Sequence, residues 1–118
     1  MRLPNAENAW VDQSKLSDYL LSEAHPVGRS KARLFRGIGF HEENVATLEQ
    51  ALLEIARTEE VAASVTSAHG VKYVLDGSVV APSGRGIRLR TVWIVDTGRD
   101  RPRFVTAYPL GQGAEGLR

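Results

Sequence analysis

The chain has 118 residues, of which 42% are hydrophobic and 25% charged, and its formal net charge is +1. These values suit one packed domain, and they exclude disorder, collagen-like repeats and coiled coils. The chain contains no cysteine, which excludes a disulfide framework and thiolate catalysis, and it has no apolar run of the ~18 residues that span a membrane, so we expect a cytoplasmic protein without a secretory leader.

Two helices are predicted before residue 40. Apolar residues at helical spacing follow Asp12 and Ser14, either of which can cap a first helix that runs to about Ser22. Proline is favoured in the first turn of a helix, and the residue before it is held extended. His25-Pro26 therefore predicts a second helix, which has His25 as its cap and ends at Gly37.

A third helix is predicted over residues 41–58. Its apolar residues repeat at spacings of three and four, which places them on one stripe opposite the glutamates. Residues 42–60 contain six glutamates and one arginine, whereas residues 26–36 contain four basic and no acidic side chains, and residues 82–103 contain six arginines and two aspartates. The two basic stretches form a positive face suited to phosphates if the fold brings them together; otherwise they are ordinary solvated surface.

The second half of the chain predicts a sheet. Runs rich in β-branched and aromatic residues predict four strands, over residues 61–67, 71–80, 87–95 and 103–108. Their connections are too short for a parallel crossover, so neighbouring strands pair antiparallel. The predicted fold class is α+β, with three N-terminal helices packed on a four-stranded antiparallel meander. We expect one domain over residues 1–110 and a flexible tail over residues 111–118.

The second helix has a cation where packing favours apolar side chains. Lys31 falls on the same predicted face as Phe35, so its ammonium either extends to solvent or faces a cavity, where it can bind phosphate or transfer a proton. His25 precedes the helix start, where N–H groups attract anions, and is either a structural cap or a group for proton transfer. The arginines of this helix are expected to face solvent: Arg29, Arg33 and Arg36.

Arg90 is a cation in the predicted sheet, at a position where packing also favours an apolar side chain. Alternation places it beside aliphatic side chains in the third strand, on the face opposite Thr91. A charged group in a central strand must be paired or bind a ligand, and a guanidinium fits phosphate well. The fourth strand is expected to place Phe104, Thr106 and Tyr108 on one face, where the Thr106 hydroxyl either pairs across the sheet or holds a phosphate.

No motif for a cofactor or a metal is present in the sequence. The three histidines lack the spacing of a zinc site, and the chain has no phosphate-binding loop, GxSxG motif or paired carboxylates. We therefore expect neither metal nor cofactor, which leaves the chain's own side chains to carry any chemistry.

Four separated blocks of the sequence carry a family resemblance. They are Leu3-Pro4-Asn5-Ala6, the run from His25 to Ala32 with the following Phe35 and Gly39-Phe40, Arg90 to Val95, and Val105 to Pro109. Together they resemble a bacterial family known as domain of unknown function 6883, over about residues 3–109. More distantly, helices followed by a four-stranded meander resemble the barnase, EndoU, colicin and RelE-like endoribonucleases, many of which are toxins of bacterial conflict systems.

The second resemblance implies metal-independent cleavage of RNA, in which the 2′-hydroxyl attacks the adjacent phosphate. The roles it implies are proton transfer by His25, phosphate stabilisation by Lys31 and Arg90, hydrogen bonding by Thr91 and Thr106, and backbone binding or base stacking by Arg29, Arg88 and Tyr108. The chain departs from the barnase pattern, because its last two strands lack the paired carboxylate and histidine. Whether Lys31 and Arg90 share a face depends on the strand register.

Three functions remain open at this point. A ribonuclease toxin requires its cationic residues to converge in one cleft, and it implies RNA and a small antitoxin or immunity protein as partners. A non-catalytic module would use a flat basic face for nucleic acid or an apolar edge for a protein. An antitoxin or immunity protein would present the acidic third helix to a basic enzyme.

Overall fold

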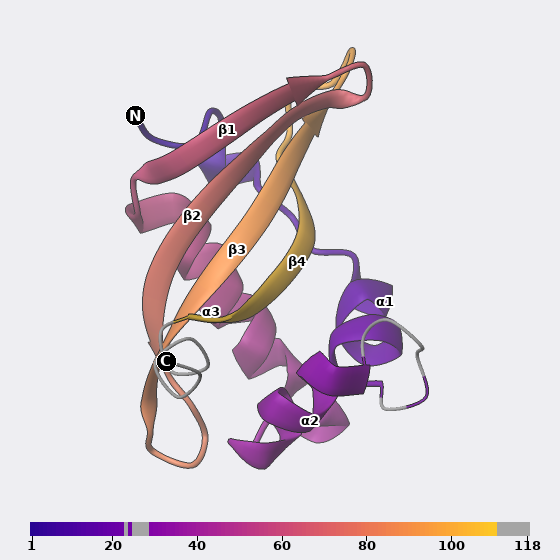
Figure 1. Cartoon of the computed structure of the whole chain (residues 1–118), viewed down its shortest axis with the longest axis vertical. Coiled ribbons are helices and arrows are strands. Elements are labelled where there is room, and N and C mark those ends of the chain that lie inside the picture. Colours follow the sequence, from indigo (N-terminus) through magenta and orange to yellow (C-terminus); the bar gives the residue numbers. More distant parts are fainter. Residues whose placement is uncertain (23, 25–28, 111–118) are drawn as a thin grey trace.

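The computed structural model describes residues 1–22, 24 and 29–110, and for residues 29–31 it describes the backbone alone. This part of the chain has helices in its first half and a sheet in its second, as predicted, and Figure 1 shows the longest helix behind the sheet. The helical elements are η1 (Ala6–Asn8), α1 (Gln13–Lys15), η2 (Leu16–Leu20), α2 (Arg29–Gly37), η3 (Glu42–Asn44) and α3 (Val45–Thr58). None of these helices is long and apolar enough to cross a membrane.

The first predicted helix is confirmed as α1 followed by η2, and it ends at Leu20. Asp12 caps it, because its carboxylate accepts a hydrogen bond from the backbone N–H of Ser14 at 3.0 Å. The second helix is confirmed from Arg29 to Gly37. Its predicted cap, His25, lies outside the described residues.

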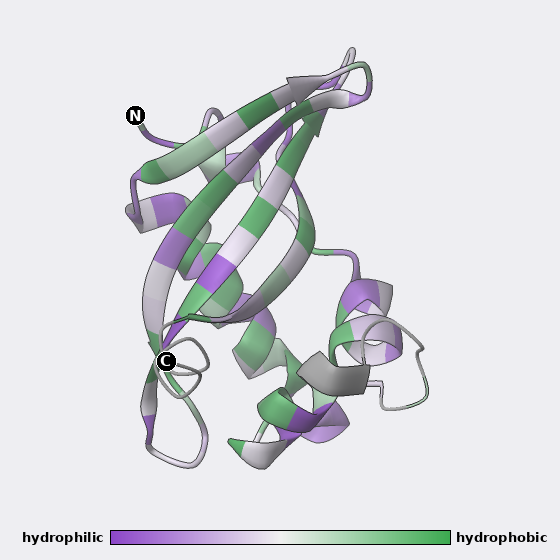
Figure 2. Cartoon of the chain, viewed as in Figure 1, coloured by the Kyte–Doolittle hydropathy of each residue, from purple (hydrophilic) through white to green (hydrophobic). Residues whose placement is uncertain are grey.

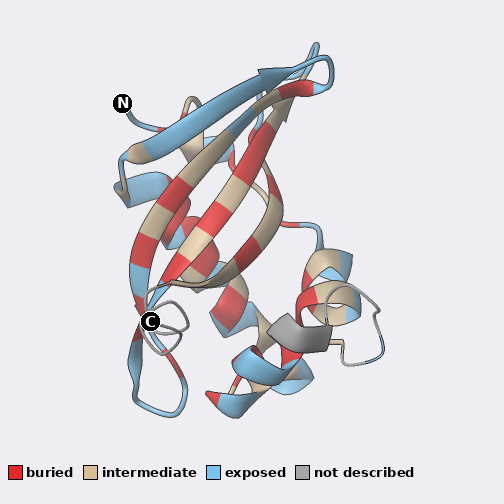
Figure 3. Ribbon diagram, in the orientation of Figure 1, coloured by how far each residue is buried: buried red, intermediate tan, exposed pale blue. Residues whose placement is uncertain are grey.

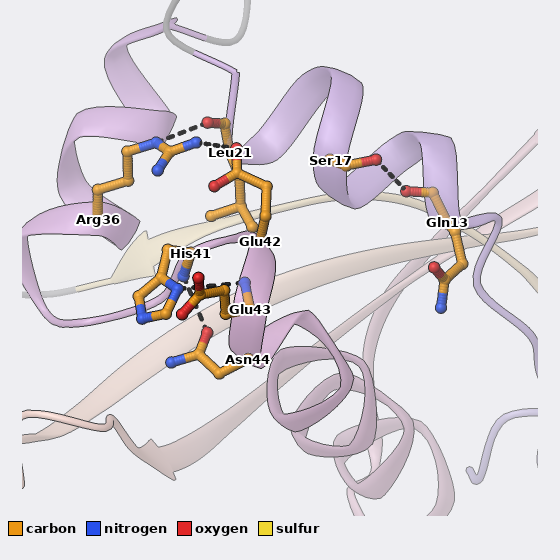
Figure 4. Close-up of polar contacts among 8 residues, drawn as sticks. All are labelled: Gln13, Ser17, Leu21, Arg36, His41, Glu42, Glu43 and Asn44. Atoms are coloured by element: carbon orange, nitrogen blue, oxygen red, sulfur yellow. Dashed lines mark hydrogen bonds and ion pairs between the residues drawn. The ribbon is translucent and has the colours of Figure 1, made fainter.

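His41 begins the third helical segment, which is confirmed as η3 and α3. The Nδ1 atom of His41 accepts a hydrogen bond from the Glu43 N–H at 3.2 Å, and the Asn44 side chain accepts one from the His41 N–H at 2.9 Å. This reciprocal pair is a capping box, which satisfies backbone donors that the first turn leaves open (Figure 4). The helix ends at Thr58, as predicted.

Arg36 fixes α2 against its helical neighbours. Its Nε donates to the Leu21 carbonyl at 2.8 Å, and its guanidinium pairs with Glu42 at the start of η3 (Figure 4). The expectation that Arg36 simply faces solvent was therefore wrong, because it joins the ends of three helical segments. Arg33 is exposed, as expected.

The four predicted strands are confirmed and form one antiparallel meander. Their bounds are β1 (Val61–Ser67), β2 (Gly70–Val80), β3 (Gly86–Asp96) and β4 (Arg103–Leu110), in the spatial order β1-β2-β3-β4. Asp96 and Arg103 close the turn between β3 and β4 with two hydrogen bonds, of 3.0 and 3.1 Å. The last strand continues past Pro109, where the sequence predicted its end.

Contact with α3 assigns the residues of β2 to the two sides of the sheet, and the register extends this assignment to β3. A Cβ added at Gly77 would lie 2.7 Å from Ile55 Cγ1, so the odd-numbered residues of β2 face α3 and the even-numbered ones face away. Figure 3 shows the resulting alternation of burial along β2 and β3, and Figure 2 shows a similar alternation of hydropathy. The core cluster includes Leu48, Leu52, Ile55, Leu75, Leu89 and Trp93. The side away from α3 is named the outer face.

A β-bulge in β4 reverses the expected side of one aromatic residue. Val92 pairs with Thr106, but Trp93 pairs with Phe104, so β4 has one extra residue at this point. Phe104 is fully buried against Trp93, with ring centroids 5.3 Å apart, while Thr106 lies on the outer face. The expectation that Phe104 and Thr106 share a face was wrong, because strict alternation does not hold across a bulge.

Substitution of Gly77 tests the contact between α3 and the sheet. Gly77→Ala is expected to lower the free energy of unfolding by about 1–3 kcal/mol, because the added methyl group overlaps Ile55. Gly86→Ala is the matched control, since Gly86 also lies in a strand and a Cβ there meets no atom within 4 Å. Denaturant unfolding measures both variants, and equal losses would contradict this packing.

Acid titration tests the ion pair of Asp96 with Arg103. Hydrogen bonds from Arg103 hold the pKa of Asp96 below its ordinary value, so the pair stabilises the fold above the unfolded pKa of ~3.9 and loses this contribution as pH falls through the folded value. The side chains are 35% and 34% exposed, which limits the effect to under about 1 kcal/mol. Asp96→Asn should be less stable than wild type at about pH 6, and the difference should shrink as pH falls below about 4. A stability difference that is independent of pH would contradict this account.

Candidate functional site

The outer face carries a polar cluster that three strands build together. Strand register places Asp76 of β2 opposite Arg90 of β3, and Arg90 opposite Tyr108 of β4. Thr106 lies two residues before Tyr108 on the same side, and its hydroxyl is 3.4 Å from the hydroxyl of Tyr19. We name these five side chains the outer-face cluster. The sheet therefore brings together three of the predicted site residues: Arg90, Thr106 and Tyr108.

Arg90 and Asp76 form a bidentate ion pair at the centre of the cluster. The Nε and Nη2 atoms of Arg90 each lie 2.9 Å from a carboxylate oxygen of Asp76. These hydrogen bonds raise the pKa of Arg90 above its ordinary value, with a smaller contribution from Tyr108. The Arg90 side chain is nevertheless 38% exposed, against 17% for Asp76. Arg90 is thus a permanent cation whose plane is fixed and which still reaches solvent, an arrangement suited to an anionic ligand.

Tyr19 brings the first helix to the β4 edge of the cluster. It lies in η2, and Figure 1 shows this helical segment beside β4 rather than behind the sheet. The ammonium of Lys15 lies 5.5 Å from the centre of the Tyr19 ring, within the range of a cation–π contact. The first helix therefore places a second cation beside the Tyr19 ring.

Thr91 lies on the opposite side of the sheet and is fully buried. Its hydroxyl donates to the Leu75 carbonyl at 2.8 Å and accepts a hydrogen bond from the Trp93 Nε1–H at 2.9 Å. Both contacts are internal, so we assign Thr91 a structural role and leave it outside the outer-face cluster. Arg88 is exposed on the outer face, where its Nη1 donates to the Ser78 hydroxyl at 3.3 Å.

The second helix supplies the remaining predicted residues. His25 and the side chains of Arg29 and Lys31 lie outside the described part of the chain, so their convergence with Arg90 stays a prediction. Arg33 of the same basic stretch does meet the later basic stretch. It lines a hollow of about 170 Å³ together with Arg85. The two basic stretches therefore approach each other between α2 and the turn that joins β2 to β3.

Sequence reasoning missed three side chains of this region: Lys15, Tyr19 and Asp76. Asp76 had a recognisable signal, because it is the one acidic residue of β2 and lies between Leu75 and Gly77 in the middle of the strand. The same argument singled out Arg90, but only the register shows that the two residues are opposite each other. Among the described residues, no group of three or more histidine, aspartate or glutamate side chains is arranged to hold a metal ion.

Comparison with models of protein families identifies the family to which the chain belongs. A family model matches residues 2–111, a range that includes Arg90, Thr106 and Tyr108. The chain belongs to the family described as Domain of unknown function (DUF6883). All four sequence blocks that carried the resemblance lie within the matched part of this DUF6883 chain. No curated protein matches it.

Comparison with solved structures finds a protein chain with a similar fold. A chain of the "Contact-dependent growth inhibition toxin - immunity protein complex from Klebsiella pneumoniae 342" superimposes with a TM-score of 0.70 at 20% sequence identity. The alignment covers 90% of the DUF6883 chain and 97% of that chain. The two chains therefore share a fold across nearly their whole lengths.

A pair of threonine substitutions separates the core from the outer face. Thr91→Val is expected to lower the free energy of unfolding by about 1–3 kcal/mol, because it leaves the buried Trp93 Nε1–H without its acceptor. Thr106→Val makes the same change on the outer face, where the residue is only half-buried, and is expected to cost less, about 0.5–1 kcal/mol. Thermal and denaturant unfolding measure both variants. A larger loss for Thr106→Val would contradict these positions.

Proposed function

We propose that this chain is a metal-independent ribonuclease of the toxin type, which cleaves RNA on the outer face of its sheet. The observation that carries the proposal is the convergence of Arg90, Thr106 and Tyr108 beside the carboxylate of Asp76. A fixed guanidinium, a hydroxyl and an aromatic ring are groups that recognise the phosphate and base of a nucleotide. The fold that this chain shares with one chain of a toxin–immunity complex supports a role in a system of that kind.

The proposed reaction is a transesterification within the RNA strand. The 2′-oxygen bonds to phosphorus, and the bond between phosphorus and the 5′-oxygen breaks. A base takes the 2′-hydroxyl proton and an acid protonates the departing 5′-oxygen, which leaves a cyclic phosphate and a 5′-hydroxyl. Negative charge accumulates on the phosphate oxygens in the transition state, and Arg90 would stabilise that charge.

Each side chain has a specific proposed role in this reaction. Asp76 holds the Arg90 guanidinium in position, and Thr106 donates a hydrogen bond to a phosphate oxygen. His25 is proposed for proton transfer and Lys31 as a further phosphate-binding cation. Arg88 and Arg29 are proposed to bind the RNA backbone, and Tyr108 to stack on a base.

A protein partner follows from the same proposal. The matching structure is a complex between a toxin and an immunity protein, and a ribonuclease with an exposed cation at its site needs such an inhibitor. We propose a small acidic protein that covers the outer face, since opposite charges promote fast and specific association. The cytoplasm, which contains the RNA, is the proposed compartment of action.

An immunity role is the second candidate, because two observations favour it. Arg90 is already paired with Asp76, which reduces its demand for an external anion. The start of the third helical segment also exposes Glu42 and Glu43, and Glu54 of α3 is exposed as well. An acidic surface of this kind would suit a partner that is a basic enzyme.

Induced expression separates the two candidates. Wild type should arrest growth and degrade RNA, seen on a gel of total RNA, and the purified protein should cleave RNA in excess chelator. Arg90→Lys keeps the positive charge opposite Asp76 but loses the bidentate geometry, so cleavage is expected to fall about 100-fold. Lys31→Ala should also reduce cleavage.

Arg57→Lys is the matched control, since Arg57 is exposed on α3 and has no proposed role. Its cleavage rate should equal that of wild type. Normal growth and intact RNA with every variant, wild type included, would contradict the ribonuclease and favour the immunity role. Cleavage that survives in folded Arg90→Lys and Lys31→Ala would contradict the assigned site.

A further inference from the structure

A second polar site lies at the turn between β3 and β4, beyond the outer-face cluster. It is a groove of about 630 Å³ where this turn meets the N-terminal segment. Its lining includes Trp10, Asp96, Arg99, Asp100, Arg101 and Arg103. None of these residues belongs to the outer-face cluster, and the proposed reaction uses none of them.

The aromatic wall of this groove is held firmly by the fold. Trp10 pairs in parallel with Arg103 beside β4: its N–H donates to the Pro102 carbonyl at 3.0 Å, and its carbonyl accepts from the Phe104 N–H at 3.0 Å. The guanidinium of Arg101 lies 5.6 Å from the centre of the Trp10 ring, and its Nε donates to the Asn8 carbonyl at 3.0 Å. The backbone of Trp10 is thus fixed, and the residue is half-buried, so part of it is accessible in the groove beside Arg101.

The charges of the groove leave an exposed cation near that ring. Asp96 is occupied by its two hydrogen bonds with Arg103. Three arginines line the groove against two aspartates, so positive charge is in excess, and the side chain of Arg99 is exposed. An aromatic ring beside an accessible guanidinium is the combination that binds single-stranded nucleic acid, with a base on the ring and a phosphate on the cation.

The groove and the outer-face cluster lie along the same strand. Arg103 pairs with Ile94, an outer-face residue of β3, so both sites open toward the same side of the sheet. Arg103 and Thr106 pair with Ile94 and Val92, which are two residues apart on β3, so the two positions are separated by roughly 7 Å along the sheet. One extended RNA strand can therefore contact both sites.

We propose that this groove binds one nucleotide of a single-stranded RNA substrate next to the cleavage position, with the base stacked on Trp10 and a phosphate on Arg99. This inference rests on the proposed ribonuclease function. It identifies the substrate as single-stranded at this point, because a base paired within a duplex cannot stack on a protein ring.

Binding of a short RNA with 2′-O-methyl groups tests the groove without cleavage, since that RNA has no 2′-hydroxyl to attack. Fluorescence anisotropy of the labelled oligonucleotide should show that Trp10→Leu weakens binding about tenfold or more, whereas Trp10→Phe, which keeps a ring, stays within about threefold. Arg99→Gln should lower the slope of log affinity against log salt by about 0.7. Arg57→Gln, on α3, is the matched control and should bind as wild type does.

Intrinsic fluorescence gives a second measurement, made on the wild type with Trp10→Phe as its reference. The oligonucleotide should quench Trp10 in the wild type, while Trp93, which is fully buried, should give the unquenched remainder seen in Trp10→Phe. Absence of quenching, or equal affinity for wild type and folded Trp10→Leu, would overturn the proposal. Tighter binding of an acidic peptide of equal length would also overturn it, and would assign the groove to a protein partner.

The two proposals can fail separately. RNA cleavage by the wild type, with oligonucleotide binding that is insensitive to Trp10 and Arg99, would overturn the groove and leave the ribonuclease intact. Binding that requires Trp10 and Arg99, without cleavage by any variant, would support the groove as a nucleic-acid site and overturn the ribonuclease.

Discussion

The contact between α3 and the sheet is the constraint on which the rest of the structure depends. Ile55 lies against Gly77 closely enough to leave no room for a side chain, and this position commits one set of alternating residues to the core. The other set, which includes Asp76 and Arg90, is thereby directed away from α3. The buried face holds the fold together by apolar packing, so the outer face is free to carry polar side chains without loss of the core.

The sequence predicted the helices and strands better than it predicted which of their residues lie opposite one another. Strand periodicity and turn residues placed all four strands, and α3 ended at the predicted residue, because both signals are local. The bulge that separates Phe104 from Thr106 has no comparable signal, since one extra residue leaves the composition of a strand unchanged. Arg90 was recognisable as a charge in a central strand, but its partner Asp76 depended on the strand register, which turn type and loop length set and strand composition does not reveal.

The pair of Asp76 and Arg90 is compatible with a ribonuclease and with an immunity protein. Growth and RNA cleavage must therefore decide between these two functions. A carboxylate that holds a guanidinium in one plane prepares it to bind a phosphate through its exposed edge. The same carboxylate also neutralises the cation when no ligand is present. Tyr108 lies opposite Arg90, and Tyr19 contacts the neighbouring Thr106, so both add aromatic surface to the cluster.

The central claim is that Arg90 contacts the phosphate of bound RNA. Nuclear magnetic resonance of the arginine guanidinium N–H groups, during titration with a 2′-O-methyl oligonucleotide, measures this contact, because Asp76 occupies Nε and Nη2 of Arg90 and a phosphate on the remaining edge changes the guanidinium signals. The account predicts a saturable change in the Arg90 signal while that of Arg57 on α3 stays constant. An unchanged Arg90 signal in the presence of bound oligonucleotide would contradict it.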